Sequence, residues 1–191
     1  MKWILGFVVA AVAVCAGGVV ALQPEKEQQQ QEVHTEPTLI ASLGWERGYT
    51  FTPPPTHVIV AVWDDGVVVW NSTPHGGPTY YFSTVSKEAL ARLKDQTNKL
   101  DLRGVRGRHH APPDSSCFRL RFVSAHEQLP IRLSISHSGF LSGTDSKFIE
   151  AWWIVSTELQ QIRPGVGTRL LDSEEMQERF KETFPGLELG S

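Results

Sequence analysis

The segment HVIVAVW (57–63) is followed by DDG (64–66) and then by VVVW (67–70). An Asp-Gly pair between two β-branched runs is typical of a β-hairpin, because glycine adopts positive φ without steric cost. Alternate residues are apolar in both registers, so these strands should be covered on both faces. The hairpin therefore predicts the central part of an antiparallel sheet.

Further strands are predicted on both sides of this hairpin. The apolar stretch 38–52 is either an irregular strap or one or two short strands, and it ends at three prolines (53–55). Downstream, 79–82 should form a third strand. The segments 118–122 and 131–136 alternate apolar with polar residues, which is typical of strands with one buried and one wet face.

Three helices are predicted from caps and apolar periodicity. Ser86 should cap a helix over 87–99, a second should begin near Asp145 or Ser146 and end at Ile162, and a third should start at Asp172 or Ser173. We therefore expect an α+β fold: an antiparallel sheet of about five to six strands with two or three helices packed on one face, preceded by an N-terminal transmembrane or signal helix.

The N-terminus predicts export. Residues 3–22 form a run of 20 residues without charge, and at about 1.5 Å per residue this run spans the ~30 Å of a bilayer's hydrocarbon core. The run is either an uncleaved anchor, with Lys2 kept in the cytoplasm, or a signal peptide cleaved after Ala21. In both cases the remainder is extracytoplasmic, that is membrane-bound and single-pass, or secreted or periplasmic.

The segment 23–37 follows, with four consecutive glutamines, and contains too few apolar residues to bury a core. It is expected to be a flexible stalk, with a helical extension of the anchor as the alternative. The predicted organisation is a transmembrane anchor or signal peptide (1–22), a Gln-rich stalk (23–37) and a single globular domain (38–191).

Composition excludes two classes of protein. With 18 basic and 21 acidic residues the net charge is −3, which does not suit a nucleic-acid-binding domain. Only two cysteines occur, Cys15 and Cys117, and Cys15 lies in the apolar N-terminal run, so a disulfide scaffold is excluded.

No motif predicts catalysis or a cofactor. The seven histidines lack the spacing of a metal site, and neither a CxxC, an HExxH nor a GxSxG pattern occurs. A cysteine nucleophile would need a histidine within hydrogen-bond reach, so Cys117 with His109 or His110 is kept only as an alternative, a hydrolase-type enzyme. We expect no catalytic residue, no metal and no cofactor.

The candidate binding residues are Arg119, Arg121 and Arg132. If the two alternating strands pair as a hairpin, the three guanidinium groups share the exposed face, where they could bind a carboxylate or phosphate. The alternative is a solvated or ion-paired face, with the arginine stems lying over the sheet. Trp45 and Trp153 are the tryptophans expected to be exposed.

The hairpin, with the aromatic strand and Ser-capped helix that follow it (57–98), resembles exported or membrane-anchored bacterial proteins of uncharacterised function that carry a similar hairpin. The resemblance implies export and assigns no functional residue. We expect a membrane-anchored extracytoplasmic domain acting as a non-catalytic binding module at the cell envelope, with an envelope protein or an anionic ligand as partner. A structural envelope protein is the other alternative.

Overall fold

The computed structural model describes residues 36–46, 56–73, 78–105, 109–110, 116–140, 142–187 and 189. The predicted membrane segment (1–22) and residues 23–35 of the predicted stalk lie outside the described residues. Among the helices of the described residues, none is long and apolar enough to cross a bilayer.

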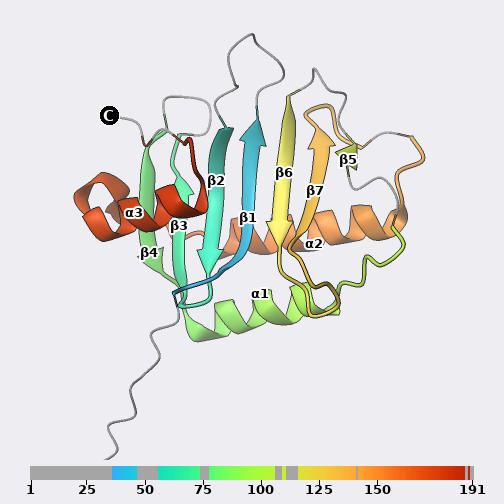
Figure 1. The fold of residues 1–191 in the computed structure, drawn as a ribbon, viewed down its shortest axis with the longest axis horizontal. Coiled ribbons are helices and arrows are strands. Elements are labelled where there is room, and N and C mark those ends of the chain that lie inside the picture. Colours follow the sequence, from blue (N-terminus) through green and yellow to red (C-terminus); the bar gives the residue numbers. More distant parts are fainter. Residues whose placement is uncertain are drawn as a thin grey trace, which may run out of the picture. The chain divides into compact units, whose positions relative to one another are not determined.

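The described residues form an α+β fold around one sheet (Figure 1). The strand order is β5-β7-β6-β1-β2-β3-β4-β8, and every neighbouring pair is antiparallel except β5 with β7. The strands are β1 (Leu39–Glu46), β2 (Thr56–Trp63), β3 (Val67–Asn71), β4 (Tyr80–Thr84), β5 (His109–His110), β6 (Cys117–Phe122), β7 (Ile131–Ser136) and β8 (Thr168–Arg169). The helices are α1 (Lys87–Lys99), α2 (Ser146–Ile162) and α3 (Glu174–Thr183), with a 3₁₀ turn, η1 (Leu170–Asp172), before α3.

The predicted hairpin turn and the predicted helix starts are confirmed. In the turn between β2 and β3, Gly66 has φ of 87° and the side chain of Asp65 accepts a hydrogen bond from the backbone N–H of Val67 at 3.0 Å. The Ser86 hydroxyl accepts from the N–H of Ala89 at 3.2 Å at the start of α1. Asp145 caps α2, and α3 begins after its own serine cap.

The predicted strand count of five to six is too small. Within the stretch 38–52, the described residues 39–46 form one strand, β1, which lies between β2 and β6; residues 47–52 lie outside the described residues. Two further strands, β5 and β8, are only two residues long. A two-residue strand is too short to carry a period-two pattern, so such strands leave no signal in the sequence.

The first face of the sheet is covered by α1 and α2. Their buried side chains pack on the apolar residues of every long strand except β4, which adds the half-buried Tyr81. Phe148, Val155 and Leu159 of α2 are fully buried. This layer is the larger core, and it agrees with the expected packing of helices on one face.

Of the two or three helices expected on one face, two are there, and the third, α3, packs on the opposite face. Met176 and Phe180 of α3 pack on Val58, Trp63 and Tyr80, which point to the opposite face of β2 and β4. The physical reason lies in the apolar residues on both faces of the central hairpin, which leave a second surface that has to be covered. In Figure 1, α3 crosses in front of β2, β3 and β4, while α2 runs behind the sheet.

Among the described residues, helix cover on the second face extends over only half of the sheet, because α3 is short. Its 10 residues extend about 15 Å at ~1.5 Å per residue, which matches about three strands at ~4.8 Å spacing. No described helix lies over β1, β6 and β7 on this face (Figure 1). We call the surface formed by these three strands the open half of the sheet.

Candidate anion-binding site

The three arginines predicted from the sequence all lie on the open half. Arg119 and Arg121 are two residues apart on β6, and β6 and β7 form the predicted antiparallel hairpin. Arg121 is directly opposite Arg132 on β7, and on its other side it is opposite Ser42 of β1. Arg119 is likewise opposite Ser134 of β7 and Gly44 of β1. The site therefore consists of two cross-strand rows on three adjacent strands, which we call the grid: Ser42, Arg121 and Arg132 form one row, and Gly44, Arg119 and Ser134 form the other.

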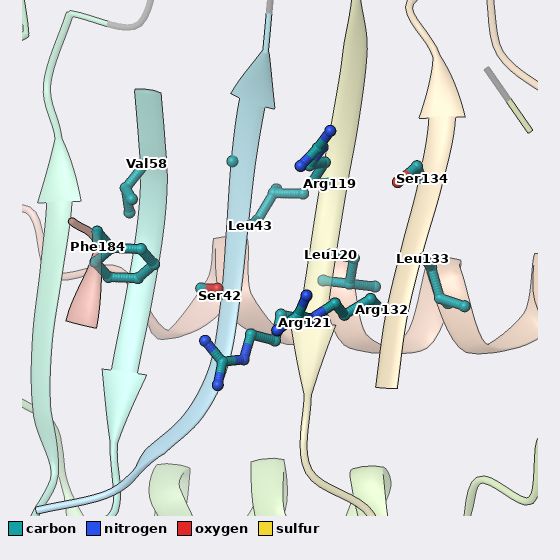
Figure 2. Close-up of a pocket in the computed structure, with 11 residues that line it drawn as sticks. Ser42, Leu43, Val58, Arg119, Leu120, Arg121, Arg132, Leu133, Ser134 and Phe184 are labelled. Carbon is teal, nitrogen blue, oxygen red and sulfur yellow. The ribbon is translucent and has the colours of Figure 1, made fainter. Parts of the chain in front are cut away.

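This grid lines a cavity of about 430 Å³, drawn in Figure 2. Its volume falls in the range of about 300–1,000 Å³ that is typical of small-molecule sites. One wall is apolar: Val58 of β2 and Phe184, the residue that follows α3, line it. Phe184 is held in place by edge-to-face packing on Trp63, with ring centroids 6.3 Å apart. The cavity thus joins a cationic floor to an apolar side.

Arg119 is neutralised by an ion pair. Its guanidinium contacts the carboxylate of Glu46, which ends β1 and lies on the same face. The Arg119 side chain is largely exposed, and such exposed pairs contribute little stability. The pair nevertheless removes one positive charge from the grid.

Arg121 and Arg132 have no such neutralising partner. Within the described part of the chain, neither guanidinium forms an ion pair or a hydrogen bond with an acidic side chain. Burial lowers the pKa of Arg121, and the positive charge of Arg132 lowers it further. An arginine side chain nevertheless keeps its proton at any physiological pH. Two adjacent positive charges therefore stand in the cavity uncompensated by described residues.

Two serine hydroxyls in the same cavity likewise have no hydrogen-bond partner among the described residues. Ser42 is 6% exposed and Ser134 is 8% exposed, and both line the cavity. Neither hydroxyl makes a hydrogen bond with any described residue. Because both hydroxyls line the cavity, they are free to bond to what occupies it. These two hydroxyls can donate to an acceptor that enters the cavity.

Gly44 keeps the floor of the cavity bare. It occupies the position opposite Arg119, and a Cβ added there would lie 3.1 Å from the backbone oxygen of His57. Sequence reasoning missed Gly44, Ser42, Ser134, Val58 and Phe184. Ser42 and Gly44 could be found only once β1 was paired with β6, and Phe184 only once α3 was placed on the second face. Ser134 could have been found from the predicted pairing of β6 with β7.

The alternative site at Cys117 is described only in part. Cys117 is 5% exposed, its sulfur lies 3.8 Å from a carboxylate oxygen of Glu46, and burial raises the pKa of the thiol. A raised pKa disfavours the thiolate, which is the nucleophilic form of cysteine. The backbone of His109 and His110 lies on β5, beyond β7, so it is about two strand spacings of ~4.8 Å from β6.

A second cavity, of about 410 Å³, lies on the other face of the sheet. It is lined by apolar side chains of β1, β2, β6 and β7, by residues from the middle to the end of α2, and by Arg163, which follows the helix. Trp153, predicted to be exposed, lies at this cavity and is 60% exposed. Trp45, the other tryptophan expected at the surface, is half-buried and stacks on His57 at 5.8 Å between ring centroids.

Among the described residues, no group of three or more metal-ligating side chains converges on one point. The arginines, hydroxyls and apolar wall of the open half therefore form the candidate site that the described residues support best. Comparisons with protein-family models and with curated proteins found no match to this chain.

Proposed function

We propose that this protein is a non-catalytic binding domain that takes an anionic ligand or an anionic group of a partner on the open half of its sheet. The observation that carries the proposal is the direct cross-strand juxtaposition of Arg121 and Arg132, neither paired with a described carboxylate, in a cavity of about 430 Å³. Like charges directly opposite each other on a sheet are destabilising. A bound anion removes that cost, so the arrangement favours binding.

The test is thermal unfolding of the full-length chain in neutral detergent with a panel of sodium salts. Benzoate, sulfate and phosphate are each compared with chloride at equal ionic strength, so that general screening cancels. At least one anion of the panel should raise the melting temperature of the wild type above the chloride value, since a ligand that binds only the folded state stabilises it. An R121Q/R132Q double variant should show no such difference.

Two outcomes would overturn the proposal. One is that no anion of the panel stabilises the wild type beyond chloride. The other is that the double variant is stabilised as much as the wild type, which would place the anion elsewhere on the molecule. The matched control is Arg163→Gln, because Arg163 is an exposed arginine at the second cavity, on the other face of the sheet.

We further propose that the domain works outside the cytoplasm at the cell envelope, tethered to the membrane by residues 3–22. The length and apolarity of that segment support this location, and the Gln-rich segment behind it is suited to hold a folded domain away from the bilayer. The full-length chain should sediment with membranes and resist carbonate extraction. A soluble product that begins at Leu22 would instead establish cleavage, and full-length chain in the cytosol would refute export.

A further inference from the structure

We infer that the anion is a phosphate monoester with an apolar organic group, bound with its phosphate on Arg121 and Arg132 and its organic group against Val58 and Phe184. This inference rests on the proposed function and names the chemical class of its ligand. Three features carry it: the charge of the site, its hydrogen-bond donors and its apolar wall.

The charge of the site matches a dianion. Of the three arginines, Arg119 is already paired with Glu46, which leaves two positive charges that no described residue compensates. A phosphate monoester carries about −1.5 to −2 at pH 7, whereas a carboxylate or a sulfate monoester carries −1. A monoanion would leave one of these two cations uncompensated, and a dianion leaves none.

The donors are arranged for an acceptor with several oxygens. Residues opposite each other on antiparallel strands have Cα atoms about 4.5–5.5 Å apart, so the forks of Arg121 and Arg132 can reach one group. In Figure 2 both side chains extend across the sheet toward β1, where Ser42 is the partner of Arg121 in the strand pairing. A terminal phosphate has three acceptor oxygens, enough for two guanidinium groups and the hydroxyl of Ser42, which bonds to no other described residue.

The apolar wall selects against a bare phosphate. Val58 and Phe184 line the side of the cavity toward α3, and neither offers a hydrogen-bonding side chain. Inorganic phosphate would fill only a small part of about 430 Å³ and would leave this wall in contact with water. An aromatic or aliphatic ester group covers the wall and gains the free energy of apolar burial.

The test is isothermal titration calorimetry on the full-length chain in neutral detergent, with ligands that differ in one property each. Phenyl phosphate and phenyl sulfate differ in charge at nearly the same shape. Glycerol phosphate keeps the dianion but has a polar organic group. Dihexanoyl phosphatidate replaces the ring by acyl chains and thereby distinguishes a lipid source from a soluble aromatic one.

At pH 8 phenyl phosphate should bind at least about tenfold more tightly than phenyl sulfate, since a second charge-assisted contact is formed. It should also bind more tightly than glycerol phosphate. At pH 5 its affinity should fall by about tenfold, because the second phosphate pKa is near 6 and only about a tenth of the ligand is then a dianion. Arg132→Gln should reduce phenyl phosphate binding to the level of phenyl sulfate, whereas Arg163→Gln should leave it unchanged.

The outcomes separate the two proposals. If phenyl sulfate and phenyl phosphate bind equally and both require Arg132, the anion site stands and the phosphate monoester is overturned. If glycerol phosphate equals phenyl phosphate, the apolar organic group is overturned. If no anion binds, or none requires Arg132, both this inference and the proposed function fail. Preference for dihexanoyl phosphatidate over phenyl phosphate supports a lipid monoester, and the reverse supports a soluble one.

Discussion

Replacing Arg132 by glutamine should stabilise the fold. Arg132 is directly opposite Arg121 on the neighbouring strand, and like charges in that position cost about 0.2–1 kcal/mol. Arg132 is exposed, so the loss of its stem removes little packing. For a domain of this size about 1 kcal/mol corresponds to ~2–4 °C, and the expected gain in melting temperature is therefore about 0.5–4 °C.

The assay is thermal and urea unfolding of the full-length chain followed by circular dichroism at several salt concentrations. The gain should be largest near 10 mM salt, where the Debye length is about 30 Å, and smaller near 1 M, where it is ~3 Å. Arg132→Lys is the matched control, because it keeps the charge and should give no gain. The reasoning is refuted if Arg132→Gln is less stable than Arg132→Lys at low salt, since Arg132 would then hold a structural ion pair.

Three further predictions address the layers and the alternative site. Phe180→Ala should lower the free energy of unfolding by about 3–5 kcal/mol, because the ring is fully buried between α3 and the sheet. The control is Leu129→Ala, at a residue that is 78% exposed, which should change the free energy of unfolding by less than about 0.5 kcal/mol. Gly167→Ala should lower the free energy of unfolding by at least about 1–3 kcal/mol, since the new Cβ would lie 2.2 Å from a tryptophan ring and 2.6 Å from a backbone oxygen. Gly165→Ala is the control, because its Cβ meets nothing within 4 Å. Equal urea midpoints for the two variants would contradict this packing. Cys117→Ser should leave phenyl phosphate affinity within about twofold of wild type in calorimetry, and loss of binding in a folded variant would revive the cysteine hypothesis.

The parts of the fold that local sequence determines were predictable. Gly66 marks the central hairpin because a positive φ is required there, and Ser86 marks the start of α1 because its hydroxyl replaces a missing backbone acceptor. The shared face of Arg119, Arg121 and Arg132 was predictable for the same reason. Strands have a period of two, and the predicted hairpin of β6 and β7, joined by a long loop, makes them neighbours.

The remainder depends on contacts between segments distant in sequence. The insertion of β1 between β2 and β6 brings Ser42 into the site, and nothing within residues 39–46 specifies those partners. The apolar residues on both faces of β2 indicate that both faces must be covered. The apolar face of α3, however, does not indicate which of the two faces this helix covers. For that reason Phe184, whose position depends on α3, could not be assigned to the site in advance.

The most direct test of the binding face is a map of amide and arginine Nε–H chemical-shift changes in isotopically labelled full-length protein titrated with phenyl phosphate. We predict the largest changes at Arg121 and Arg132, with smaller ones along β1 and β7 and none on α2. Changes centred on Trp153 and the second cavity, or no saturable change at all, would contradict the assignment of the open half as the binding surface.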